Sequence, residues 1–123
     1  MFAPDRRARR PSLVASLGAL LAGTAIGLSA YASHGVSDAL AQQHLNMAAL
    51  YAFAHGAVLA ALAPRAQGAL GRLAMGLLLL GTLLFAGSLA GHALWHWPTR
   101  LAPYGGMALM LGWALVAINA LRR

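Results

Sequence analysis

The apolar residues of this chain are gathered in four runs, each long enough to cross a lipid bilayer. None of the runs contains Asp, Glu, Lys or Arg, and they cover residues 12–32, 45–63, 73–94 and 101–121. A hydrocarbon core of about 30 Å needs about 20 apolar residues in a helix. Unpaired strand edges are excluded from lipid, and the runs lack the polar alternation of a membrane barrel. The pattern therefore predicts an all-α, integral membrane four-helix bundle.

Composition favours the same class and excludes several others. Hydrophobic residues make up 60% of the 123 residues and charged residues 9%, whereas about 25% of the residues in an average soluble domain are charged. The absence of Cys excludes disulfide and thiolate–metal scaffolds. The formal net charge is +7, but the Arg residues stand at the ends and turns of the runs and not on one basic face, so no nucleic-acid partner is expected.

The distribution of Arg predicts the orientation in the membrane. If all four runs span the bilayer, eight of the nine Arg residues fall on one side and only Arg100 on the other. Because Arg collects in cytoplasmic segments, both termini are placed in the cytoplasm of a bacterial cell. Residues 1–11 are then a cytoplasmic Arg-rich tail, 12–121 a single transmembrane domain in the inner membrane, and 122–123 a cytoplasmic end.

Two features of the first run and its loop modify this picture. Ala30-Tyr31-Ala32 resembles a signal-peptide cleavage site, but the run is longer than the 7–15 apolar residues of a signal core, so a retained span is favoured. The loop 33–44 contains Asp38 and two Gln. It is expected in water or headgroups, with a short interfacial helix capped by Ser37.

Rows of small residues at four-residue spacing predict where the helices pack. Transmembrane helices associate by close approach, which Gly and Ala permit. The first run has Ala15 and Ala19 in one row with two glycines, and the second run has a similar row around its single glycine. The glycines predicted to lie between helices are Gly23, Gly27, Gly56, Gly87, Gly91, Gly106 and Gly112.

His55 is the most informative polar residue, because it falls near the middle of the second span. Ionisable residues at this depth are functional candidates by default. A neutral imidazole that hydrogen-bonds to a neighbouring helix is the favoured interpretation, and a ligand or proton site is the alternative. Tyr51 lies one turn away, and helix depth predicts a layer of Tyr51 and Ser88 with Gly27 and Gly106, in which His55 is one turn deeper beside Gly23.

The remaining chemistry is weak. His92 and His96 have the i, i+4 spacing of a helical metal pair, which His34 could complete, but one such pair falls short of a zinc signature and no metal is expected. No catalytic residue, cofactor or phosphate-binding loop is indicated, and an enzyme is not expected. A proton-coupled exporter would want a carboxylate within a span, and none is present.

Short motifs in a fixed order resemble a known family. They are Ser33-His34-Gly35, Tyr51 with His55 four residues later, Phe85-Ala86-Gly87-Ser88-Leu89, Pro103-Tyr104-Gly105-Gly106 and Gly112-Trp113. In this order they are similar to the motifs of the small bacterial membrane proteins called domain of unknown function 423, which are themselves similar to transmembrane protein 256. The resemblance implies a four-helix inner-membrane protein and no particular activity.

Together these observations predict a small integral membrane protein that is non-enzymatic. It is expected to contact the lipid bilayer and to pack with itself or with a larger membrane complex. The alternative is a transporter-like or small-ligand-binding bundle that uses His55, Tyr51 and Ser88.

Overall fold

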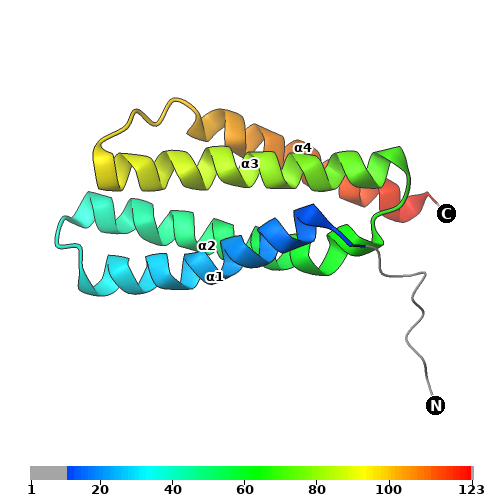
Figure 1. Cartoon of the computed structure of the whole chain (residues 1–123). Coiled ribbons are helices and arrows are strands. Elements are labelled where there is room, and N and C mark those ends of the chain that lie inside the picture. Colours follow the sequence, from blue (N-terminus) through cyan, green and yellow to red (C-terminus); the bar gives the residue numbers. More distant parts are fainter. Residues whose placement is uncertain (1–10, 123) are drawn as a thin grey trace, which may run out of the picture.

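The computed structural model describes residues 11–122, which form four long α-helices and one short 3₁₀ turn (Figure 1). Each of the four helices is long and apolar enough to cross a membrane, so the predicted all-α membrane bundle is confirmed. The elements are α1 (Leu13–His34), α2 (Ala39–Leu62), η1 (Ala63–Arg65), α3 (Gly68–Trp95) and α4 (Ala102–Leu121). Residues 1–10 of the predicted tail, and residue 123, lie outside the described part of the chain.

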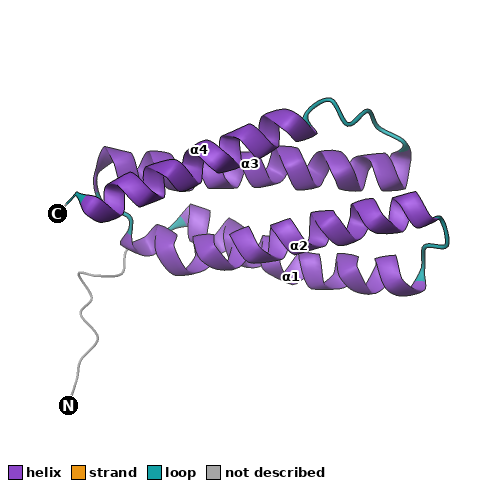
Figure 2. Cartoon of the chain, turned by 180° about the vertical axis from the view of Figure 1, so that it is seen from behind, coloured by secondary structure: helices purple, strands orange, loops and turns teal. Residues whose placement is uncertain are grey.

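The helices are arranged as two antiparallel hairpins, α1–α2 and α3–α4, which lie one above the other in both views (Figures 1 and 2). The α1–α2 and α3–α4 connections lie at one end of the molecule. The start of α1, η1 and the end of α4 lie at the other. We call these the loop end and the terminal end. If each helix spans the membrane once, the α1–α2 and α3–α4 connections lie on one side of it and the α2–α3 connection lies on the other.

The hairpins are joined through their inner helices. Helix α1 packs mainly on α2, α4 packs mainly on α3, and α2 packs on α3. In the most apolar windows of α2 and α3, 39% and 44% of the residues are buried, against 11% and 17% in α1 and α4. The two outer helices therefore present most of their surface to the surroundings, and the core lies between α2 and α3.

Helix α2 begins six residues earlier than the predicted span. Asp38 caps it, because its carboxylate accepts a hydrogen bond of 2.9 Å from Ala41 N. The Gln42 amide donates to Ala32 O at 2.9 Å, and Leu45 is fully buried. The loop is therefore shorter than expected and covers residues 35–38. The expected helix around Ala39 and Leu40 is the first turn of α2 and not a separate element, and Asp38 caps it instead of Ser37.

Helix α3 begins at Gly68, five residues before the predicted span, and so includes Arg72 in its second turn. It ends at Trp95, and His96 follows in the left-handed conformation with φ 57°. Helix α4 begins at Ala102 with Pro103 in its first turn. Proline is compatible with this place, because its missing N–H has no partner in the first turn of a helix.

In each hairpin, the two helices cross at a pair of glycines whose backbone atoms are in contact. A Cβ built on Gly56 would lie 2.5 Å from Gly18 O, and one on Gly18 would lie 2.7 Å from Gly56 O. In the second hairpin, a Cβ on Gly81 would lie 2.9 Å from Gly105 O, and one on Gly105 would lie 2.8 Å from Gly81 O. Any side chain at these crossings would force the two helices of the hairpin apart.

The glycine prediction is only partly right. Gly56 lies in a crossing, and Gly112 packs against Leu78 of α3, while Gly91 packs against the Trp97 ring and not against another helix. Four others have open space where a Cβ would be, so their assignment as contacts between helices of this chain is wrong: Gly23, Gly27, Gly87 and Gly106. In α1 the contact row starts at Gly18 and continues through Ala25 and Ala32, because α2 covers a face turned away from the predicted row.

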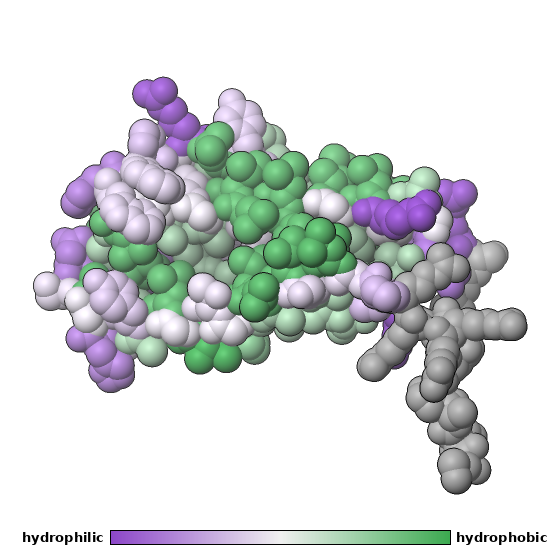
Figure 3. Space-filling model, viewed as in Figure 1, coloured by the Kyte–Doolittle hydropathy of each residue, from purple (hydrophilic) through white to green (hydrophobic). Residues whose placement is uncertain are grey.

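The surface agrees with a membrane location. Figure 3 shows hydrophobic side chains gathered around the middle of the molecule and hydrophilic ones near both ends. Four aromatic rings are exposed at the loop end, where such side chains anchor in the headgroup region. They are Tyr31, Trp95, Trp97 and Tyr104.

Candidate functional site

A partly buried polar cluster links α2 to α4, two helices of different hairpins. His55 of α2 is buried, with 8% of its surface exposed. Trp113 Nε1 donates a hydrogen bond of 3.0 Å to His55 Nε2. The other ring nitrogen, His55 Nδ1, lies 2.9 Å from the carbonyl oxygen of Tyr51, one turn earlier in the same helix. One imidazole thus forms hydrogen bonds with residues of both hairpins.

These two contacts assign the form of the imidazole. The indole N–H of Trp113 can only donate a hydrogen bond, so His55 Nε2 must carry a lone pair. The proton of the neutral ring is then on Nδ1, which donates to the carbonyl oxygen of Tyr51. Both ring nitrogens are engaged within the protein, as expected for a buried polar group that fixes helix packing.

Aromatic contacts extend the cluster along one side of α2. The Tyr51 and His55 rings are stacked, with centroids 5.8 Å apart and planes 6° apart. Tyr51 also meets Phe85 of α3, with centroids 4.6 Å apart. These rings form one wall of a half-open groove of about 540 Å³, whose opposite wall is α4 with Met107 and Met110. The groove opens toward the lipid-facing surface and could hold an apolar group.

Ser88 does not belong to this cluster. It is buried in α3, does not line the groove, and its hydroxyl is the buried side-chain oxygen without a hydrogen-bond partner in the described part of the chain. The predicted layer is therefore wrong for two of its four members, Ser88 and Gly27. Gly27 is exposed, and His55 turns toward α4 and not toward Gly23. Of that layer, Tyr51 and Gly106 do line the groove.

The histidines at the loop end form a pair that the sequence did not predict. His44 Nδ1 and His92 Nδ1 lie 3.0 Å apart, so one ring donates a hydrogen bond to the other across the α2–α3 contact. His92 and His96, considered as a weak metal candidate, do not lie on one helix face, because His96 follows the end of α3 in a left-handed conformation. His34 is exposed in the last turn of α1. Residues 11–122 contain no group of three or more metal-ligating side chains.

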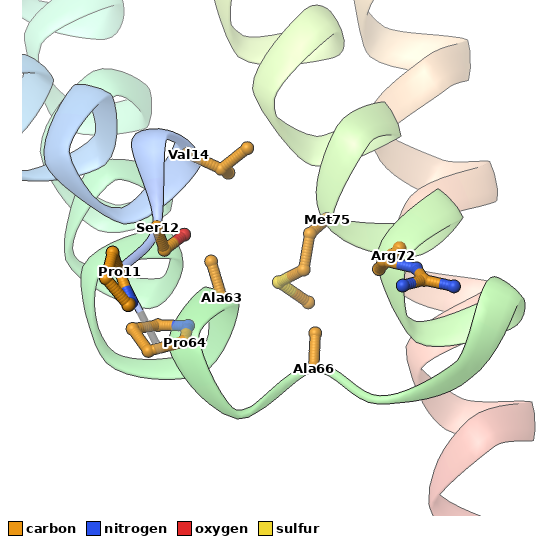
Figure 4. A pocket seen from close by; sticks show the side chains of 8 residues that line it. All are labelled: Pro11, Ser12, Val14, Ala63, Pro64, Ala66, Arg72 and Met75. Carbon is orange, nitrogen blue, oxygen red and sulfur yellow. The ribbon is translucent and has the colours of Figure 1, made fainter. Parts of the chain in front are cut away.

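The terminal end carries three Arg residues within the described part of the chain, and these residues line two pockets. Figure 4 shows a pocket of about 300 Å³ between the start of α1, η1 and α3, with Arg72 and Met75 on its α3 side. A second pocket of about 550 Å³ is lined by Arg65 and Arg122 together with Gln67 and Asn119.

Sequence reasoning named His55 and Tyr51 but missed their partners. Trp113 lies 58 residues from His55, and its role depends on how α4 is rotated against α3, which the sequence does not state. Phe85 and His44 were missed for the same reason. A weak signal was present, because Trp113 is the tryptophan that falls within a predicted span and not at its end. An indole N–H inside a membrane needs an acceptor.

The fold and surface define a multi-pass helical membrane protein. The family described as a protein of unknown function, DUF423, matches residues 28–106, and the chain belongs to this family. It is also similar to a UPF0382 membrane protein of Schizosaccharomyces pombe, with 30% identity over 116 residues that cover 85% of this chain and 96% of the relative. No solved structure is significantly similar to the chain.

Proposed function

We propose that this protein is a non-enzymatic component of a bacterial cytoplasmic membrane, with both termini in the cytoplasm, that packs with itself or with a larger membrane assembly. The observation that carries the proposal is the use of both His55 ring nitrogens by Tyr51 and Trp113. A histidine engaged in this way tightens the bundle and offers no free nitrogen to a substrate.

The outer helices support a role in assembly. Helices α1 and α4 are less buried than α2 and α3, and they expose large apolar side chains such as Leu20, Ile26, Met110 and Leu111. Lipid or neighbouring transmembrane helices can cover such faces equally well. The Arg residues at the terminal end favour the cytoplasmic side.

Extraction of the protein from its native membrane in a lipid-preserving polymer, followed by native mass spectrometry, tests the proposal. The expected result is a particle that contains more than one polypeptide, and the masses identify whether the neighbours are copies of this chain or other proteins. A particle with a single copy of this chain and no other protein at native abundance would contradict the assembly role.

A small-ligand-binding or transporter-like bundle is the second candidate, and the groove beside Tyr51 and His55 is the observation that favours it. Met107→Trp would fill the groove from its α4 wall, while the His55–Trp113 hydrogen bond stays in place. In reconstituted vesicles, loss of solute flux in Met107→Trp would favour this candidate over the first. The absence of flux in the unaltered protein would leave the assembly role standing.

A further inference from the structure

Among the residues that the structure describes, the terminal end holds three Arg side chains and no carboxylate side chain. Arg65 and Arg122 line one pocket, and Arg72 lines another. The sole carboxylate side chain in residues 11–122 is that of Asp38, which caps α2 at the opposite end of the bundle. Guanidinium groups at a membrane surface attract anionic lipids and phosphates. This end is therefore suited to attract an anion from its surroundings.

The pocket that contains two of these Arg residues has the chemistry of a headgroup site. Its polar lining is Arg65 of η1, Gln67 just before α3, and Asn119 and Arg122 at the end of α4. Arg presents donors in a planar fork that matches phosphate oxygens. Gln67 precedes α3 without capping it through its side chain, so the first-turn N–H groups of α3 add a positive dipole end beside the pocket.

An apolar groove continues from the same pocket along α3 and α4. It has a volume of about 200 Å³ and is lined by apolar residues that include Ala74, Met75 and Val116. The two cavities share Arg65, Ala66, Asn119 and Ala120 in their linings. A Cβ on Gly71 would lie 3.3 Å from Asn119 Nδ2, so this amide rests on α3 at the junction of the cavities. A polar compartment therefore opens directly into an apolar one.

From this arrangement we infer that the terminal end binds one anionic phospholipid, with its phosphate between Arg65 and Arg122 and the start of an acyl chain in the groove along Val116. Both compartments fit one amphipathic molecule, whereas free phosphate would leave the apolar groove unused. Anionic lipid is abundant on the cytoplasmic side of membranes. The inference rests on the proposed orientation only for the leaflet in which the lipid lies.

Native mass spectrometry of the detergent-purified protein, titrated with phosphatidylglycerol or phosphatidylcholine, tests this inference. The unaltered protein should bind one phosphatidylglycerol several-fold more tightly than phosphatidylcholine. Removal of both charges in Arg65→Gln/Arg122→Gln should weaken phosphatidylglycerol binding by about 5- to 30-fold, as expected for two Arg residues near a lipid headgroup. Arg72→Gln/Arg100→Gln loses the same net charge outside this pocket and should retain the preference.

Two further experiments test whether the groove contributes to binding and whether free phosphate can take the place of the lipid. Ala120→Phe should fill the groove entrance from an exposed position, and it should weaken lipid binding without loss of helicity or of the monodisperse elution profile. Inorganic phosphate at millimolar concentration should not displace the bound lipid.

The inference is overturned if phosphatidylglycerol and phosphatidylcholine bind equally. It is also overturned if the two double variants behave alike, or if inorganic phosphate displaces the lipid. Binding in detergent does not depend on which face of the bilayer carries this pocket. A failure here is therefore distinct from a failure of the proposed orientation.

Discussion

At the scale of the residue, His55 shows how a polar side chain is accommodated within a membrane bundle. Its ring accepts from the indole of one neighbouring helix and donates to a carbonyl of its own helix. Hydrogen bonds between transmembrane helices contribute about 0.6 kcal/mol on average and up to about 1.7 kcal/mol. This bond is the polar link from α2 to α4, so its contribution is expected toward the upper part of that range.

A double-mutant cycle measures this link directly. Trp113→Phe keeps an aromatic ring but leaves His55 Nε2 without a donor, and it should reduce the free energy of unfolding by about 1 kcal/mol. His55→Leu should make the tryptophan substitution nearly neutral, because the acceptor has been removed. The measurement is unfolding in mixed micelles with increasing denaturing detergent.

Trp95→Phe is the matched control for this cycle, because Trp95 is 62% exposed at the loop end. Its effect should stay within about 0.5 kcal/mol, as for an ordinary surface substitution. Additive effects of the His55 and Trp113 substitutions would show that the two residues are not coupled.

At the scale of the element, the hairpins are set by backbone contact and not by large side chains. The Gly18–Gly56 and Gly81–Gly105 crossings bring main-chain atoms of neighbouring helices together. Close packing of this kind stabilises membrane helices, for which no hydrophobic driving force exists between lipid and protein. Glycine is therefore required at these four positions, while glycines with open space where a Cβ would lie, such as Gly23 and Gly106, are replaceable.

Adjacent glycines of α4 allow a sharp test of this distinction. A Cβ on Gly105 would lie 2.9 Å from Phe85 Cα and closer still to Phe85 N, whereas a Cβ on Gly106 would meet nothing within 4 Å. Gly105→Ala should lower the free energy of unfolding by about 1–3 kcal/mol through overpacking. Gly106→Ala should be neutral or slightly stabilising, because it adds helix propensity without a clash.

The first hairpin offers the same comparison. Gly56→Ala would bring its Cβ to 2.8 Å from Ala22 N, while Gly23→Ala has open space, so we expect a loss for the first and no loss for the second. The readout is again unfolding in mixed micelles. Equal stabilities within either pair would contradict the glycine crossings.

The sequence predicted the existence of all four helices, because runs of about 20 apolar residues are a strong signal. It could not predict which face of each helix meets its neighbour. Gly18, Gly23 and Gly27 are equally small, and only the rotation of α1 against α2 selects Gly18. Likewise, His55 was identified from its depth in the span, but its partner Trp113 depends on the long-range placement of α4.

At the scale of the whole molecule, the bundle has two ends of different character. The terminal end carries Arg65, Arg72 and Arg122. The loop end carries four exposed aromatic rings, Asp38 and the His44–His92 pair. An arrangement with all described Arg residues but Arg100 at one end predicts that this end faces the cytoplasm.

Cysteine accessibility measures this claim most directly, since the chain contains no Cys of its own. Ser37→Cys places a thiol in the α1–α2 connection, and Gln67→Cys places one just before α3. In intact spheroplasts, a membrane-impermeant maleimide should label Ser37→Cys, while Gln67→Cys should be labelled only after the membrane is opened. Labelling of both thiols from outside would contradict a crossing of the membrane by α2, which lies between them. Labelling of Gln67→Cys alone would contradict the orientation.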